Sequence, residues 1–490
     1  MHLRLSLFIF FSVLLAPACR TVADELYHSD LSAYHDSSGA IVRDDDGGGW
    51  QSRRSEILAE LQRVMGALPP SRSEVALDLQ VDESRTVEDP DFRRDWISLA
   101  SGDGDRIPAL LYIPKGASAS DRRPGIVALH PTSPLGKLVV AGEGPLPNRN
   151  YAEELARRGY VVIAPDYPSF GDYSGYSFAT DSYVSGTMKG IVNHRRCVDY
   201  LLTRDDVVPD RIGAIGHSLG GHNAMFLGVF DERVQAVVSS CGWNAFGDYY
   251  EGDITGWSGE RYMPRLKTDY GLDLHRVPFD FHEIVGALAP RWFLSVSPLR
   301  DRNFEVTGVM RVIPEARKVY QWQNVPDRLV VRYPNAEHDF PQESRREAYA
   351  FLDRALEFGE ANAEAISPER FTGPWDMNEF MRPPKIRWGK SSGNVREVYY
   401  EGPDYEGHPT EVFAYYATPA DASNRPHPAM VLVRPVEARH LKNGHDFGPS
   451  RVTWRWRWTL PGKGRTENAI HWPGRHRPMR RNFERSISME

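Results

Sequence analysis

The hexapeptide Gly216-His217-Ser218-Leu219-Gly220-Gly221 constrains this chain more than any other stretch. An apolar run at 211–215 precedes it and another at 223–228 follows it, which predicts a strand entering the hexapeptide and a helix leaving it. A Gly-x-Ser-x-Gly sequence in that context is typical of a nucleophile elbow, a strained turn that exposes the serine hydroxyl. A glycine-rich turn that contains serine by chance is the alternative. The strand and the helix favour the elbow, with Ser218 as a nucleophile.

Strand and helix patterns alternate over residues 94–360. A hairpin signal at 101–104 joins two predicted strands, and the following short apolar runs are typical of strands buried on both faces of a parallel sheet. Such alternation predicts an α/β fold with a doubly wound, mainly parallel sheet. The predicted strands are 96–99, 107–113, 125–130, 160–164, 234–238, 292–296 and 329–333, and the predicted helices include 151–159, 183–202 and 345–358.

A serine nucleophile needs a histidine base and a carboxylate that orients it. In this architecture the order is serine, then acid, then histidine, with each residue after a strand. His338 follows the last predicted strand, and Asp301 follows the strand before it, so we expect these two as base and acid, with Glu305 as the runner-up acid. Four other histidines lie in or beside the elbow or in the segment 242–290, where the topology does not deliver a base: His217, His222, His275 and His282.

The oxyanion hole is expected from two backbone N–H groups. One belongs to Leu219, directly after the nucleophile, and the other to the loop after the strand that ends at His130. Because Pro131 has no N–H, the donor there is Thr132 or, less favoured, Ser133.

Several motifs together resemble the α/β-hydrolase superfamily. They are the elbow, the turns Leu129-His130-Pro131-Thr132 and Ala164-Pro165-Asp166-Tyr167, the tripeptide Ala289-Pro290-Arg291, and Glu337-His338. Within the superfamily the chain looks most like the dienelactone hydrolase and acetyl-xylan-esterase-like group, with kinship to prolyl-oligopeptidase catalytic domains. The resemblance covers about residues 95–358 and implies the α/β-hydrolase fold. His-Pro-Thr replaces the His-Gly of many relatives, which leaves the second oxyanion donor open.

The first residues, 1–18, have Arg4, an apolar run and Ala16-Pro17-Ala18, which together are typical of a signal peptide. We favour plain export over lipid attachment at Cys19, and both place the protein in a secreted or periplasmic location. Residues 19–93 are interpreted as an N-terminal extension. It consists of a loosely held polar arm to residue 49 and an amphipathic helix at 50–68.

Composition narrows the classes of partner and cofactor. The net charge of −7 and the absence of a basic, aromatic stripe in the body of the chain argue against nucleic-acid binding. Three cysteines provide no metal-ligand spacing, and no cofactor is implied. We predict that Cys197 and Cys241 are buried thiols and do not form a disulfide, and that no segment spans a membrane.

Two segments depart from the alternating pattern. Residues 242–290 are long and aromatic, which predicts a lid or a substrate wall, or else a cover for one edge of the core. Residues 361–433 contain strand patterns at 395–400, 410–417 and 429–433 and resemble the start of a second, incomplete hydrolase domain. The basic tail 434–490 is interpreted as an out-of-frame or truncated end that is disordered, in preference to a nucleic-acid or membrane segment.

These features predict an exported serine hydrolase that cleaves carboxylic esters, either small molecules or acyl groups on carbohydrate. Two alternatives stay open. A serine peptidase of the prolyl-oligopeptidase type is opposed by the short segment before residue 95, which leaves no room for a propeller. A non-catalytic binding protein with a hydrolase fold is the other. The oligomeric state does not follow from the sequence.

Overall fold

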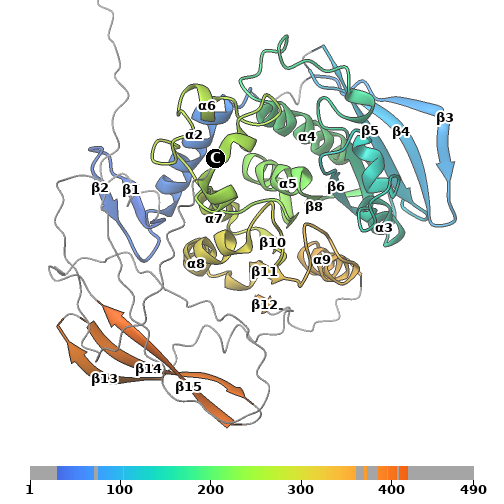
Figure 1. Cartoon of the computed structure of the whole chain (residues 1–490). Helices are drawn as coiled ribbons and strands as arrows, with labels where there is room; N and C mark the ends of the chain where they lie inside the picture. Colours follow the sequence, from blue (N-terminus) through green and yellow to red (C-terminus); the bar gives the residue numbers. More distant parts are fainter. Residues whose placement is uncertain are drawn as a thin grey trace, which may run out of the picture. The chain divides into compact units, whose positions relative to one another are not determined.

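The computed structural model of the chain describes residues 30–70, 75–102, 104–359, 369–371, 385–393, 395–405 and 408–417. The chain divides into two units, Met1–Pro383 and Pro384–Glu490, and each is described by itself (Figure 1). Four predicted features lie outside the described residues: the signal segment 1–18, Cys19, the strand at 429–433 and the tail 434–490.

One sheet of ten described strands forms the centre of the first unit. Its order is β12-β11-β10-β9-β8-β6-β7-β5-β4-β3. The strands from β12 to β7 run parallel, and β5, β4 and β3 run antiparallel at one side, so the mainly parallel sheet is confirmed. The strands are β3 Gln80–Glu88, β4 Phe92–Ala100, β5 Arg106–Pro114, β6 Arg123–Leu129, β7 Val161–Pro165, β8 Val207–His217, β9 Val234–Ser240, β10 Trp292–Val296, β11 Leu329–Tyr333 and β12 Glu369–Phe371.

Both faces of the central strands are buried, as their continuous apolar runs predict. In β6, Val127 and Leu129 pack into one core cluster, whereas Ile126 and Ala128 pack into the other. Helices α2 Trp50–Met65, α4 Gly186–Leu202, α5 Leu219–Phe230, α7 Phe281–Leu288 and α8 Val306–Trp322 contribute to the first cluster, and α3 Tyr151–Arg157 and α9 Gln342–Ala355 to the second (Figure 1). None of the helices in the described ranges has the length and apolar character needed to cross a membrane.

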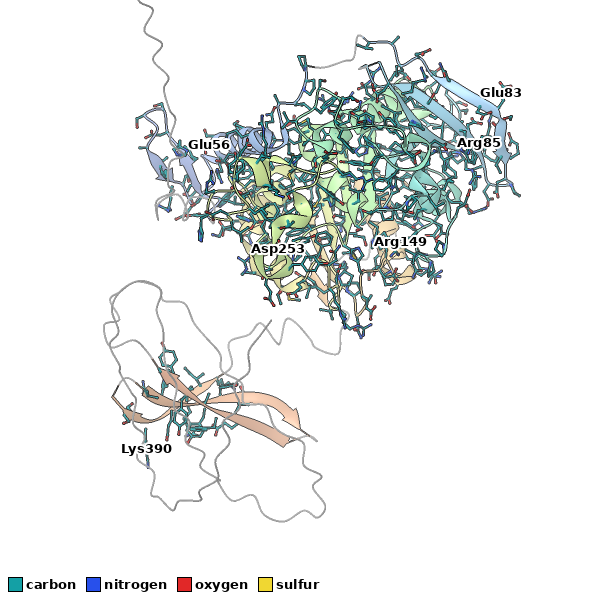
Figure 2. All side chains as sticks on the ribbon, turned by 45° about the horizontal axis from the view of Figure 1, so that its top comes forward. Glu56, Glu83, Arg85, Arg149, Asp253 and Lys390 are labelled. Carbon is teal, nitrogen blue, oxygen red and sulfur yellow. The ribbon has the colours of Figure 1, made fainter. Side chains whose placement is uncertain are left out.

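The sheet extends further toward the N-terminus than the sequence indicates. Strand β3 was not predicted because its residues are almost all exposed and lack the apolar alternation that marks a buried strand. It forms the outer edge of the sheet, where Figure 2 labels Glu83 and Arg85. Charged side chains on an edge strand discourage pairing with another chain.

The prediction of a loosely held arm is wrong for residues 30–49. This stretch forms the hairpin β1 Ala33–His35 and β2 Ile41–Arg43, and Leu31 and Ala33 are buried. Because its strands are only three residues long, the hairpin leaves no readable periodicity. The predicted helix that follows is confirmed as α2, which ends at Met65 with Gly66 as its C-cap, three residues before Pro69.

The aromatic segment 242–290 packs its largest side chains into the core. It consists of η3 Tyr249–Gly252, η4 Ile254–Trp257, α6 Arg265–Thr268 and α7. Trp243 is 1% exposed and Trp257 is 2% exposed, and each contacts the ring of Phe281. Tyr250, by contrast, is 55% exposed. Trp243 and Trp257 therefore cover part of the core, whereas the ring of Tyr250 is exposed.

The second unit contains an antiparallel sheet in the order β13-β14-β15. The predicted strands at 395–400 and 410–417 are confirmed within β14 Val395–Tyr405 and β15 His408–Ala417, whereas β13 Ile386–Ser392 was not predicted. Trp388, Phe413, Tyr415 and Tyr416 are all at least 38% exposed. Among the described residues of this unit, the three strands are the only regular elements, and these side chains lie outside a core.

Candidate active site

Ser218 occupies a tight turn between β8 and α5. Its backbone has φ 55° and ψ −119°, a strained conformation for a non-glycine residue, and its N–H donates to the carbonyl of Ser240 at 2.8 Å. A Cβ atom on Gly216 would lie 2.0 Å from the carbonyl oxygen of Gly220, and one on Gly220 would lie 2.0 Å from that of Leu129. The two glycines therefore permit the backbone approaches that hold the serine at the C-terminal edge of the sheet.

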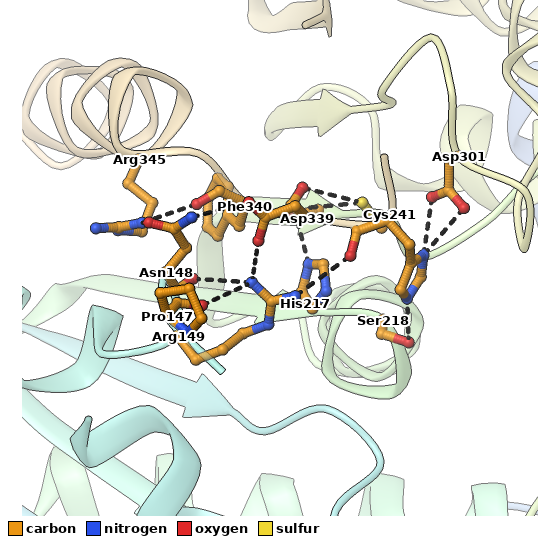
Figure 3. A network of polar contacts seen from close by, with 12 residues as sticks. Pro147, Asn148, Arg149, His217, Ser218, Cys241, Asp301, Asp339, Phe340 and Arg345 are labelled. Atoms are coloured by element: carbon orange, nitrogen blue, oxygen red, sulfur yellow. Dashed lines mark hydrogen bonds and ion pairs between the residues drawn. The ribbon is translucent and has the colours of Figure 1, made fainter. Parts of the chain in front are cut away.

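The structure brings His338 and Asp301 to this serine. The Ser218 hydroxyl lies 3.0 Å from His338 Nε2, and His338 Nδ1 lies 3.0 and 2.9 Å from the two carboxylate oxygens of Asp301 (Figure 3). The histidine follows β11 and the aspartate follows β10, and both loops open at the same edge as the turn after β8. Residues that are 37 and 120 positions apart thus form one chain of hydrogen bonds.

Asp301 is isolated from water in spite of the two arginines that flank it. Its side chain is 0% exposed, and its Oδ1 accepts the backbone N–H groups of Asn303 and Phe304 at 2.8 and 3.0 Å. Two N–H donors and the histidine ring stabilise the buried carboxylate in place of solvent. Glu305, the runner-up acid, is exposed at the start of α8, and its side chain is not among the described contacts of His338.

The two predicted oxyanion donors lie on different kinds of element, a helix and a loop. Leu219 is the first residue of α5, where N–H groups have no acceptor inside the helix, and its side chain is 1% exposed. Thr132 is exposed in the loop after β6. Next to it, buried His130 accepts the N–H of Tyr167 at Nε2, so its proton lies on Nδ1 and faces the carbonyl of Pro131 at 2.7 Å. Burial lowers the pKa of His130, which favours this neutral form.

A buried ion pair between Lys137 and Asp166 holds the loop after β6 in place. Asp166, directly after β7, accepts both the backbone N–H of Lys137 at 2.7 Å and its ammonium group at 2.5 Å. A Cβ on Gly136, which has φ 53°, would lie 2.1 Å from the Asp166 carboxylate, so only glycine fits beside it. Sequence reasoning noted the Ala-Pro-Asp-Tyr turn but assigned Asp166 no role. The only sequence signal for this role was the position of a carboxylate directly after a buried strand.

Arg149 was also missed, and it clamps the loop that carries His338. Its guanidinium group lies 2.5 Å from a carboxylate oxygen of Asp339 and 3.3 Å from the carbonyl oxygen of His338 (Figure 3). Asn148 donates to the other oxygen of Asp339 at 2.8 Å. Arg149 is only 6% exposed, so its guanidinium group is largely shielded from solvent. No feature in the neighbourhood of residue 149 pointed to a partner that lies 190 positions away.

The other histidines considered as bases lie in the protein interior or on its surface. Burial lowers the pKa of His217 well below its usual value, and that of His222 to about 3. His217 contacts the hydroxyl of Ser240 at 3.1 Å and stacks on Phe340, while His222 packs against Trp257. His282 is buried in α7, and His275 is exposed. In the described residues, His338 is the histidine that contacts Ser218.

One group of metal-ligand types lies at the site, consisting of Cys241, Asp301 and His338, whose ligand atoms are within 4.8 Å of one another. Burial raises the pKa of the Cys241 thiol well above its usual value, and the thiol contacts the carbonyl of Asp339 at 3.3 Å. A protonated thiol is a poor metal ligand, so this group fits a hydrogen-bonded network better than a metal site. Cys197 and Cys241 are both buried and free, as predicted.

Comparisons with known proteins agree with this fold. A model described as "Alpha/beta hydrolase family" matches residues 126–363. The putative hydrolase YtaP of Bacillus subtilis is 27% identical over 327 residues, which cover 62% of this chain and all of the relative. The 4-O-methyl-glucuronoyl methylesterase 1 of Wolfiporia cocos is 23% identical, over 67% of this chain and 80% of its own.

Among solved structures, a glucuronoyl esterase from Solibacter usitatus superposes with a TM-score of 0.52 at 20% identity. The superposition covers 67% of this chain and 97% of the esterase. At that identity the likeness shows the fold alone. Together with the family match over residues 126–363 and with the strand order around the serine turn, it shows that the chain has the α/β-hydrolase fold.

Proposed function

We propose that the protein is a carboxylic ester hydrolase that works through an acyl-enzyme on Ser218. The observation that carries the proposal is the continuous hydrogen-bond chain from the Ser218 hydroxyl through His338 to Asp301. An uncharged hydroxyl becomes a nucleophile only when a base accepts its proton, and His338 Nε2 lies at the distance required for that transfer.

In the proposed reaction, Ser218 Oγ attacks the ester carbonyl as its proton passes to His338 Nε2. The negative oxygen of the tetrahedral intermediate accepts the N–H groups of Leu219 and Thr132. The intermediate collapses, the bond to the alcohol breaks, and the imidazolium returns the proton to that alcohol. Water then attacks the acyl-serine with the same base, which releases the acid and restores Ser218. Asp301 holds the ring in orientation and stabilises its positive charge.

The substrate class is proposed from two kinds of support. The names of the relatives include a glucuronoyl methylesterase and glucuronoyl esterases, which favours an ester on a carbohydrate over a peptide bond. In addition, described residues of the stretch 30–93 form a hairpin, α2 and β3, and not the blades of a propeller such as large serine peptidases carry. The predicted signal segment supports an extracytoplasmic location for such an enzyme.

A direct test compares the parent protein with Ser218→Ala. A fluorophosphonate should label the parent and should not label the variant, and the parent should hydrolyse p-nitrophenyl acetate but not proline-containing amides. Cleavage of those amides would favour the peptidase. A folded parent that neither reacts with the fluorophosphonate nor turns over esters would instead be a binding protein with a hydrolase fold.

A further inference from the structure

A polar hollow lies at the loop 166–185, which joins β7 to α4. Its volume is about 610 Å³, and its lining includes Asp105, Asp172, Tyr173, Tyr176, Asp181 and Lys189. We name it the tyrosine hollow. Asp105 reaches it because it precedes β5, whose residue Ala109 pairs with Pro165 at the end of β7.

The hollow lies at the same edge of the sheet as Ser218. Strand β6 lies between β7 and β8, and adjacent strands are about 4.8 Å apart, so the ends of β7 and β8 are separated by about 10 Å. The wall is continuous with the loop that carries Thr132: Gly171 N–H donates to the carbonyl of Pro134 at 3.2 Å, and Lys137 donates to Asp172 at 2.7 Å. A molecule of several linked units can therefore reach both places.

Aromatic rings form the apolar part of the hollow. Tyr176 meets Tyr173 edge-on, with ring centroids 5.0 Å apart, and Phe178 in the same way at 5.2 Å. The ammonium group of Lys189 lies 5.5 and 5.3 Å from the ring centroids of Tyr176 and Tyr183. Tyr173 is nearly buried, whereas Tyr176 and Tyr183 are half-buried and present part of their rings to the hollow.

The carboxylates of the hollow are already engaged, which argues against a site for a cation. Asp105 lies 3.0 Å from the buried Lys189 ammonium group, and Asp172 is paired with Lys137 and lies 3.5 Å from Arg85. Asp181 accepts the hydroxyl of Tyr176 at 2.5 Å and the N–H of Tyr183 at 3.0 Å. Oxygens held in this way are oriented acceptors with spare lone pairs, suited to the hydroxyl groups of a neutral ligand.

Exposed hydroxyl groups complete the rim. Ser177, Thr180 and Ser182 line the hollow and are exposed, and each can donate and accept. A pyranose sugar is apolar on its faces and polar at its edge. The aromatic rings of the hollow suit the apolar faces, and its carboxylate oxygens and hydroxyl groups suit the polar edge.

We infer that the tyrosine hollow binds a sugar unit of a neutral oligosaccharide whose ester is presented to Ser218. The inference rests on the proposed ester hydrolase function and makes it specific. It assigns carbohydrate recognition to the loop after β7, and not to the exposed Tyr250 of the segment 242–290.

The test uses full-length Ser218→Ala and unesterified xylohexaose and cellohexaose as probes, with binding measured by calorimetry. At least one probe should bind. Adding Tyr176→Ala should weaken binding about 5- to 10-fold, whereas adding Tyr250→Ala should leave the affinity unchanged. Tyr176→Phe retains the ring and should retain most of the affinity, and its melting temperature, compared with that of Tyr176→Ala, controls for folding.

The binding assay needs no hydrolysis. Failure of the sugar-binding inference can therefore be distinguished from failure of the proposed hydrolase function. If the parent hydrolyses esters but neither probe binds, the inference is wrong and the proposed function stands. If a probe binds in a Tyr176-dependent way but the parent hydrolyses no ester, the hollow stands and the proposed function fails. Loss of binding in Tyr250→Ala only, or binding of calcium or tetramethylammonium in place of sugar, overturns the inference.

Discussion

Lys137 Nζ lies 2.5 Å from the carboxylate of Asp166 in the interior of the protein, where the two side chains are 1% and 0% exposed. The lysine belongs to η1 Gly136–Ala141, directly after the loop that carries Thr132, and the aspartate directly follows β7. The aspartate also accepts the N–H of Asp172 at 2.9 Å. One carboxylate thus ties the candidate oxyanion loop to the wall of the tyrosine hollow.

Lys137→Met should therefore destabilise the protein and impair ester hydrolysis. Removal of one partner from a buried ion pair typically lowers the free energy of unfolding by about 3–5 kcal/mol. Urea unfolding measures this change, and kcat measured under conditions where the variant is folded should also fall because the loop is no longer anchored. Lys115→Met is the matched control, since its pair with Glu88 is exposed and such pairs contribute little. Equal stability of the two variants would refute the anchoring role.

The assignment of the acid can be tested by comparing two carboxylates that lie four residues apart. Asp301→Asn should lower kcat by about 10⁴-fold, because an amide no longer stabilises the charged and correctly oriented His338. Glu305→Gln should retain near-parental kcat, since Glu305 is exposed. Steady-state turnover of p-nitrophenyl acetate measures both. A larger loss in Glu305→Gln than in Asp301→Asn would reverse the assignment.

Arg149 is proposed as a positioning residue for His338. Arg149→Met removes the contacts to Asp339 and to the His338 carbonyl, so the ring is held less well and kcat should fall about 10- to 100-fold. A change in positioning should affect kcat more than KM, and Arg149→Lys should restore part of the loss. Arg211→Met, which removes a surface contact with Glu357, serves as the control. An unchanged kcat in folded Arg149→Met would show that the loop carrying His338 keeps its position without Arg149.

Four buried histidines make stability depend on pH. Burial lowers the pKa of His130, His194, His217 and His222 from the ordinary value of 6.5, to about 3 for His194 and His222. Below pH 6.5 the unfolded chain takes up protons that the folded protein does not, so acid favours unfolding, and above pH 6.5 this effect vanishes. The expected loss is up to about 1.4 kcal/mol per pH unit for each histidine.

Urea unfolding between about pH 5 and pH 8 tests this expectation. His222→Leu should lower the slope of stability against pH by about one proton, because the leucine lies among the same aromatic rings without a titrating group. His275→Leu, at an exposed position, serves as the control. If the two variants show the same slope as the parent, burial of His222 does not limit its protonation.

Much of the fold could be predicted because burial leaves a local pattern. The strands β10 and β11 coincide with their predicted ranges, since continuous apolar runs bounded by polar residues mark strands covered on both sides. The exposed strand β3 and the short β1–β2 hairpin carry no such pattern and were missed. The core-packed tryptophans of the segment 242–290 suited a substrate wall equally well, because aromatic composition does not show which way a ring faces.

What the sequence by itself determined is local and ordered along the chain: the glycine turn around Ser218, the strands buried on both faces, and the positions of Asp301 and His338 after two of those strands. Tertiary structure alone decided which polar groups meet. Arg149 and Asp339 are 190 positions apart, and Lys137 and Asp166 are 29 apart. The reason is physical. Apolar burial repeats with the period of each helix or strand, whereas a polar contact depends on two side chains that share no segment and have no period in common.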